Sequence, residues 1–210
     1  MTGRAEYFED ERLKSMRAKP YPVRQVFSRP VATQPASASR QESLFKDEGV
    51  TVLQSKPLIE AWFDGAIAPK NPGGHASYGV VIKIGGVIAC NLDAYVGHGD
   101  GMSNNVAEAC GVIRVLEELP GFLELNPGAT AVVYGDSQIV INALKNRSAG
   151  GLFAPYIQKA QQLYVPLRDR VRLQWIPREQ NGAADALSKR PLLVRGIIIE
   201  RREELIEWRP

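Results

Sequence analysis

The stretch Trp62-Phe63-Asp64-Gly65-Ala66 places a carboxylate at the end of an apolar run that begins at Leu58. A mostly apolar run of this length is typical of a central β-strand that is covered on both faces. An ionised carboxylate is costly to bury without a partner, so the charge of Asp64 requires compensation. We therefore expect this strand to form the centre of a sheet and Asp64 to belong to a functional site.

Three further acidic residues occur in similar settings. Glu108 lies in an otherwise apolar helical stretch, Asp136 follows a short β-rich run, and Asp185 lies near the start of a helix of small residues. Four carboxylates brought together repel one another strongly unless cations lie between them. The pattern indicates a metal-ion nuclease centre. The alternative is that these acids are helix caps or surface charges.

The remaining pattern predicts an α/β domain. Gly85-Gly86 indicates a tight hairpin, and Pro120 and Pro191 predict the ends of two helices. The element order β-β-β-α-β-α-α-β-α implies a five-stranded mixed sheet, three antiparallel strands and then two parallel to the first, with helices on both faces. The expected elements cover residues 58–68, 77–84, 87–96, 103–119, 130–134, 136–144, 155–164, 171–176 and 181–189.

This topology lets the four acids meet at one edge of the sheet. Asp64 lies in the first strand, and Asp136 lies just past the carboxyl end of a strand parallel to it. Glu108 and Asp185 each lie in the first half of a helix, so both can point at the same edge. Hard cations prefer oxygen ligands, which fits a set of carboxylates without histidine or cysteine.

Five short motifs follow one another along the chain. They are Phe63-Asp64-Gly65, Asn71-Pro72-Gly73-Gly74, Ser103-Asn104-Asn105-Val106-Ala107-Glu108, Gly135-Asp136-Ser137-Gln138 and Asn181-Gly182-Ala183-Ala184-Asp185-Ala186-Leu187-Ser188. Each motif is weak alone, but their order and approximate spacing together are specific. Together they resemble type 1 ribonuclease H over about residues 57–190.

The resemblance implies a ribonuclease H-like fold in which four acids hold two Mg²⁺ ions, with Mn²⁺ as a possible substitute. By analogy Asp64 would bridge both ions, Asp136 and Glu108 would complete the site around the attacking water, and Asp185 would hold the other ion. Two such cations can supply a nucleophile near hydroxide in character and stabilise the leaving oxygen. The implied activity is hydrolysis of the RNA strand of RNA/DNA hybrids.

The resemblance also implies substrate contacts. Amides matching Asn104, Asn105 and Gln138 contact nucleotides in the minor groove of the hybrid, and backbone near Gly65 approaches the ribose 2′-OH. Such contacts suit a wide, shallow groove and select RNA without reading its sequence. For the asparagine pair, helix capping and turn formation are the alternative explanation.

Two departures place the chain nearer the plant-type and archaeal-type branch. The segment 146–162 contains only two basic residues, Arg147 and Lys159, and no tryptophan. The basic, tryptophan-containing handle of many bacterial members is therefore missing. The loop before Asp185 has no histidine and carries Arg178-Glu179 instead. We expect Arg178 to bind substrate, and two alternatives stay open for its partner, a phosphate or Glu179.

Composition and charge limit the possible location and domain organisation of the chain. No apolar run is long enough to span a bilayer and no secretory signal is visible, so we expect a cytoplasmic protein that does not enter membranes. The domain boundaries we expect are a basic, Pro/Ser-rich extension over 1–55, a catalytic domain over 56–190 and a C-terminal extension over 191–210. Between Glu11 and Lys46, eight basic residues face two acidic ones, which indicates either an arm that binds nucleic acid or a solvated linker.

We thus predict a metal-dependent endoribonuclease whose partner is an RNA/DNA hybrid, with a protein partner possible through either extension. One alternative is a nuclease of the same fold that acts on double-stranded RNA or DNA junctions. Another is a non-catalytic nucleic-acid-binding or structural component that retains the fold. The presence of all four acids argues against a non-catalytic role. Carboxylates that repel one another are unfavourable, so an inactive site would not be expected to retain all four.

Overall fold

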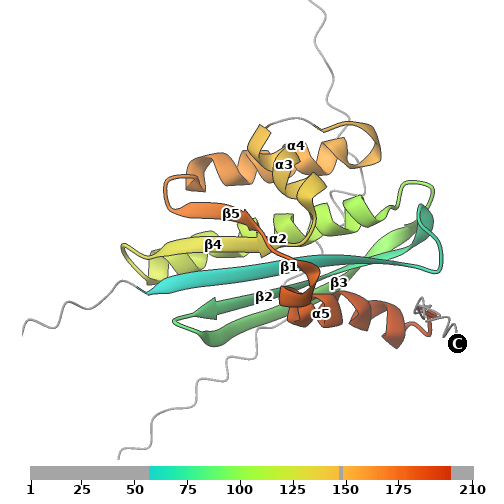
Figure 1. The fold of residues 1–210 in the computed structure, drawn as a ribbon, viewed down its shortest axis with the longest axis horizontal. Coiled ribbons are helices and arrows are strands. Elements are labelled where there is room, and N and C mark those ends of the chain that lie inside the picture. The colour runs from blue at the N-terminus through green and yellow to red at the C-terminus, as the bar shows by residue number, and fades with distance from the viewer. Residues whose placement is uncertain (1–56, 147–148, 200–210) are drawn as a thin grey trace, which may run out of the picture. The chain divides into compact units, whose positions relative to one another are not determined.

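A five-stranded mixed sheet forms the centre of the domain. The computed structural model describes residues 57–146 and 149–199. In Figure 1 the sheet has the strand order β3-β2-β1-β4-β5. β1 pairs antiparallel with β2 and parallel with β4, so it lies in the middle as expected. The strands are β1 (Leu58–Ala68), β2 (Gly73–Ile84), β3 (Val87–Gly99), β4 (Thr130–Gly135) and β5 (Val171–Trp175).

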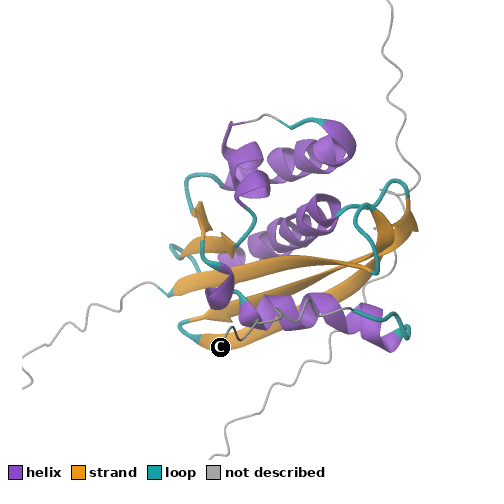
Figure 2. Ribbon diagram, turned by 45° about the vertical axis from the view of Figure 1, so that its right-hand side comes forward, coloured by secondary structure: helices purple, strands orange, loops and turns teal. Residues whose placement is uncertain are grey.

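Helices cover both faces of this sheet. In Figure 2, α2, α3 and α4 lie on one side and α5 lies on the other. The fold class expected from the sequence, an α/β domain with a five-stranded mixed sheet and helices on both faces, is therefore confirmed. The helices are α2 (Asn104–Leu125), α3 (Gln138–Asn146), α4 (Ala154–Tyr164) and α5 (Gly182–Val194), with short 3-10 turns at Gly151–Phe153, Val165–Leu167 and Arg178–Gln180.

Both helix ends predicted from proline are wrong. α2 continues through Pro120, and α5 continues through Pro191. Proline removes one backbone donor, but burial beyond it stabilises the longer helix in each case. Leu123 is buried against the core after Pro120, and Leu192 is buried beside Ala66 after Pro191. Tertiary packing therefore overrides the local signal.

Several strands are longer than the sequence indicated. β2 begins at Gly73 and β3 ends at Gly99, so His98 lies in a strand and not in a loop. The extra residues pair with each other, since Gly73 faces Gly99 and His75 faces His98. Glycine favours turns, so the expected strands 77–84 and 87–96 stop short of the glycines at 73 and 99. Ladder pairing extends both strands through these residues.

Two glycines let helices approach the sheet near the candidate site. A Cβ on Gly65 would lie 2.3 Å from the backbone nitrogen of Glu108, so α2 packs directly on β1 at that position. A Cβ on Gly79 would lie 2.3 Å from the backbone nitrogen of Ser188, so α5 packs equally closely on β2. Any side chain at either residue would push a helix away from the sheet. The two contacts bring both helices beside Asp64.

The expectations for the two extensions lie outside the described residues, apart from the part of the C-terminal segment up to residue 199. There α5 extends past the expected boundary at residue 190 and ends at Val194. Within 57–146 and 149–199, none of the helices has the length and apolar character needed to cross a bilayer.

Candidate metal centre

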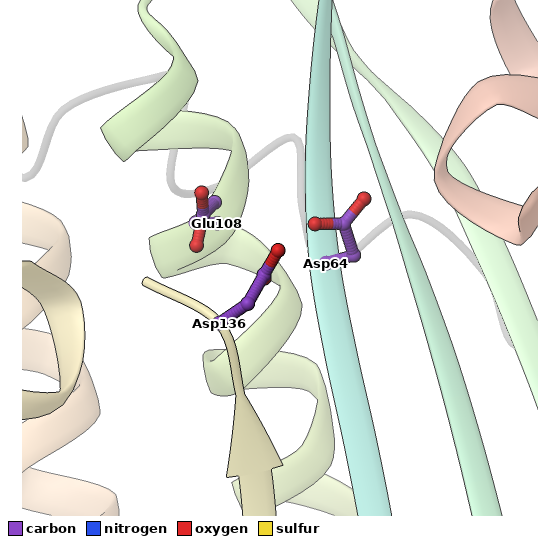
Figure 3. Close-up of side chains that lie close together, drawn as sticks. All are labelled: Asp64, Glu108 and Asp136. Atoms are coloured by element: carbon purple, nitrogen blue, oxygen red, sulfur yellow. The ribbon is translucent and has the colours of Figure 1, made fainter. Parts of the chain in front are cut away.

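Three of the four predicted acids meet at one edge of the sheet. One carboxylate oxygen from each of Asp64, Glu108 and Asp136 lies within 4.8 Å of the others. Figure 3 shows the three side chains converging from β1, α2 and the end of β4. Asp64 and Glu108 are buried, at 5% and 6% exposure, while Asp136 is half-buried. We call these three residues the acidic triad.

Local sequence positions each member of the triad. Asp64 pairs with Gly79 in the ladder, and the missing side chain at Gly79 leaves room for α5 beside the carboxylate. Glu108 lies in the second turn of α2, whose N-terminus is capped by Ser103 through a 3.3 Å hydrogen bond from the Val106 amide. Asp136 directly follows β4.

Hydrogen bonds hold each carboxylate of the triad from one side. Asn104 donates to Oε1 of Glu108 at 2.8 Å, and Asn181 donates to Oδ1 of Asp136 at 3.0 Å. Ser188 donates to Oδ2 of Asp64 at 2.7 Å. The donors are all neutral, so they orient the carboxylates without supplying a positive charge.

Burial and mutual repulsion disfavour the ionised forms of two triad residues. Removal from water raises the pKa of Asp64 to about 7, although the Ser188 hydrogen bond opposes the rise and Asp136 adds to it. Removal from water, with repulsion from Asp64 and then Asp136, raises the pKa of Glu108 to about 8. The charge of Arg178 opposes the rise for Asp64 but contributes least, so the positive charge near the triad does not compensate its carboxylates.

The donor set fits a divalent cation. Oε2 of Glu108 is buried and has no hydrogen-bond partner among the described residues. An unpartnered carboxylate oxygen in such a position is unfavourable unless a ligand completes it. Three carboxylates at this separation offer the oxygen ligands that Mg²⁺ and Mn²⁺ prefer. Asp64, Glu108 and Asp136 are thus the residues that would hold the ion.

Asp185 stands apart from the triad. Its carboxylate receives Arg178 at 3.2 Å and Lys189 at 2.5 Å, so two protein cations already balance its charge. The sequence left two partners open for Arg178, a phosphate or Glu179, and the structure instead pairs it with Asp185. Lys189 and Asp185 are four residues apart on α5, a spacing at which helical side chains commonly pair.

A cleft of about 380 Å³ joins the triad to Asp185. Of the five residues predicted to bind substrate, three line this cleft and two do not. Asn104 and Arg178 line the cleft, and so does Gly65, whose close packing on α2 explains the glycine. Within the described residues, Asn105 and Gln138 do not line it; Asn105 is half-buried and Gln138 is exposed at the start of α3.

Two polar residues of the site were missed by the sequence analysis. Asn181 is 1% exposed and bridges the Phe63 carbonyl, at 2.9 Å, to Asp136. Ser188 is fully buried against Asp64. Both stand in the motif that contains Asp185, but nothing in the sequence indicates which acid they contact. The Lys189 pair was detectable, because its spacing from Asp185 is that of a helical ion pair.

Comparison with known proteins identifies the family. Residues 63–191, more than half of the chain, match the family model described as reverse transcriptase-like. The chain belongs to the reverse transcriptase-like family. The matched residues include the acidic triad and Asp185. They also include α5 as far as residue 191, and part of this helix lines the cleft.

Solved structures similar to this family member are type 1 ribonucleases H. LC11-RNase H1, isolated from compost by a metagenomic approach, is 27% identical with a TM-score of 0.58 over 65% of this chain and 96% of its own. RNase H1 from the halophilic archaeon Halobacterium salinarum NRC-1 is 27% identical with a TM-score of 0.55 over 65% and 98%. LC11-RNase H1 in complex with an RNA/DNA hybrid is 28% identical with a TM-score of 0.54 over 61% and 92%.

The resemblance to type 1 ribonuclease H is therefore confirmed. It covers nearly the full length of those enzymes and the domain of this chain that carries the acids. The fold and the acidic triad are both consistent with hydrolytic nuclease chemistry on nucleic acid.

Proposed function

We propose that this protein is a metal-dependent endoribonuclease that hydrolyses the RNA strand of RNA/DNA hybrids. The observation that carries the proposal is the acidic triad, three carboxylates with one oxygen each within 4.8 Å of the others, none of which forms an ion pair with a cation among the described residues. Similarity to LC11-RNase H1, which binds an RNA/DNA hybrid, supports the substrate. Divalent ions bound by the triad would activate a water and stabilise the leaving 3′ oxygen.

The residues of the chain would share the remaining work. Asp64, Glu108 and Asp136 would hold the ion, while Asn181 and Ser188 keep two of these carboxylates oriented. Asn104 lies in the cleft with its amide on Glu108, where it can also meet a nucleotide. The backbone of Gly65 is a further proposed contact in the cleft, and Asn105 and Gln138, which lie outside it, are proposed to contact the minor groove of the hybrid.

Asp185 is proposed to take part once substrate is bound. Arg178 is 73% exposed, so it can leave Asp185 for a phosphate at little cost. Oδ1 of Asp185, which Arg178 holds, would then be available to a second ion, as the two-ion mechanism requires, while Lys189 stays on Oδ2. We further propose a cytoplasmic location and a catalytic domain that begins at residue 56; its expected end at residue 190 lies within α5, which continues to Val194.

A substrate panel tests the proposal. One sequence is presented as RNA/DNA hybrid, double-stranded RNA, single-stranded RNA, double-stranded DNA and a DNA junction, with Mg²⁺, Mn²⁺ or a chelator. The proposal predicts cleavage confined to the RNA strand of the hybrid, with 5′-phosphate products, and no cleavage with chelator. Cleavage of another substrate would favour a different nuclease specificity. Binding without cleavage, by the folded protein, would favour the non-catalytic alternative.

A further inference from the structure

Ser188 lies directly against Asp64 at the contact between α5 and the sheet. It is fully buried, and its hydroxyl donates to Oδ2 of Asp64 at 2.7 Å. The same oxygen is 2.8 Å from the main-chain carbonyl of Asp185, which is a second acceptor for its single proton. A hydrogen bond to an ionised carboxylate is the stronger of the two, so the hydroxyl serves Asp64 whenever that residue is ionised.

The position of Ser188 is itself held firmly. The Ser77 hydroxyl on β2 donates to the main-chain carbonyl of Ser188. Gly79 on the same strand permits contact with the backbone nitrogen of Ser188, where any Cβ would clash. The Ser188 hydroxyl therefore has little freedom to move away from Asp64. It acts as a rigid donor fixed by the packing of a helix on a strand.

A rigid donor matters because an aspartate carboxylate is otherwise free to turn. The terminal torsion of aspartate is broad, so both oxygens can sample many directions. In Figure 3 one oxygen of Asp64 points toward Asp136 and Glu108, and the other points to the opposite side. Holding Oδ2 on the α5 side leaves the remaining oxygen directed at the other two carboxylates.

We propose that Ser188 is a positioning residue that orients the Asp64 carboxylate for a divalent cation and so sets the metal affinity of the acidic triad. The inference rests on the proposed function in one respect only, namely that the triad binds a divalent ion. It predicts that loss of the hydroxyl weakens metal binding without removing any metal ligand.

Calorimetric titration of the full-length protein with Mg²⁺ tests this role. In Ser188→Ala the hydroxyl is lost, and the Kd for Mg²⁺ should rise about 10-fold or more, the range found for residues that support metal ligands. The matched control is Tyr164→Phe, which likewise removes a hydroxyl that donates to a main-chain carbonyl, that of Val171, but lies outside the cleft and contacts neither Ser188 nor the acidic triad. Its thermal stability should fall, while its Kd should stay at the wild-type value.

Cleavage kinetics provide a second readout. If Ser188 only positions Asp64, raising the Mg²⁺ concentration should restore the cleavage rate of Ser188→Ala toward that of the wild type. Ser188→Cys keeps the volume and a weak donor, so its Kd should lie between those of the wild type and the alanine variant. If Ser188→Ala does not fold, the Kd of Ser188→Cys for Mg²⁺ tests the positioning role instead.

The outcomes separate the two proposals. If the wild type binds Mg²⁺ and the alanine and cysteine variants bind it equally well, the role of Ser188 is overturned and the proposed function stands. If Tyr164→Phe weakens binding as much as Ser188→Ala, the effect is one of overall stability and the role is also overturned. If the wild type binds no Mg²⁺, the proposed function itself fails.

Discussion

The acidic triad and Asp185 lie in one cleft but differ in how their charges are balanced. The triad is held by neutral donors and is largely buried, and its carboxylates repel one another with only a weak opposing effect from Arg178 on Asp64. Asp185 is 22% exposed and receives both Arg178 and Lys189. Cations of the chain thus pair with Asp185, whereas no carboxylate of the triad forms an ion pair with a cation among the described residues.

This difference indicates where an added cation gains most. An ion at the triad relieves repulsion and satisfies the buried Oε2 of Glu108. An ion at Asp185 must displace protein cations that already satisfy the carboxylate. We therefore expect the first divalent ion to bind at the triad. Four predictions test this contrast, in order of decreasing expected effect.

The largest expected effect is that of Asp64→Asn on cleavage. The change removes a charge that an ion requires and keeps the size of the side chain, so cleavage should fall to the uncatalysed background. Without metal the variant should be more thermally stable than the wild type, because a repelled, desolvated charge is gone. Hybrid cleavage and melting temperature measure the two effects.

The control for this variant is Asp93→Asn. Asp93 lies on β3 and pairs with Arg190 outside the cleft. Its loss should leave cleavage unchanged and should not raise the melting temperature. Full cleavage by Asp64→Asn would mean that the triad is not the reaction centre.

The second effect is that of Asp185→Asn, which should be smaller in cleavage and opposite in stability. We expect about 10- to 100-fold slower cleavage, the range typical of residues that support a metal site. Because the change breaks two partly exposed ion pairs, the metal-free protein should lose up to about 1 kcal/mol of stability. Urea unfolding in the presence of chelator measures this loss of stability. A gain in stability equal to that of Asp64→Asn would erase the contrast between the two halves of the site.

The third effect is stabilisation by metal. At a Mg²⁺ concentration of 100 times Kd, the wild type should gain about 2.7 kcal/mol, and chelator should reverse the gain. Glu108→Gln keeps an acceptor for Asn104 but loses the charge, so its gain should be much smaller. Thermal unfolding with and without Mg²⁺ gives both values. Equal gains in the two proteins would show that the ion binds elsewhere.

The smallest expected effect concerns pH in the absence of metal, since water in the open cleft partly relieves the desolvation. The folded-state pKa values of Asp64 and Glu108, about 7 and 8, lie above their ordinary values of 3.8 and 4.5. The folded protein therefore binds more protons than the unfolded chain between about pH 4 and 8. These two groups make the unfolding free energy fall as pH rises through that window.

Unfolding at pH 5 and pH 8 in chelator measures this dependence. Asp64→Asn should show a shallower fall than the wild type, because one of the two groups no longer titrates. A slope identical in the two proteins would mean that the Asp64 carboxyl does not titrate in this window.

The sequence predicted the fold well where patterns were strong. The apolar run before Asp64 predicted β1 with its observed bounds, and the order of elements is correct. The errors occur at Pro120 and Pro191, where the local propensity to end a helix was opposed by burial of Leu123 and Leu192. Those contacts join segments distant in sequence, so no local pattern reports them.

The candidate site was predicted in part for the same reason. Residue type and order identified the four acids and the asparagine of the cleft, Asn104. They did not reveal that Asp185 has its own protein cations or that Ser188 contacts Asp64, since both depend on how α5 lies on the sheet. A serine in a helix of small residues carries no signal of the side chain that it meets across 124 positions.

A crystal of the substrate-free protein soaked in Mn²⁺, with its anomalous difference map, tests the contrast most directly. The account predicts one strong peak coordinated by oxygens of Asp64, Glu108 and Asp136, with Arg178 and Lys189 still on Asp185. A map with no peak at the triad, or with a peak on Asp185 alone, would contradict the claim that the triad is the site built for a cation.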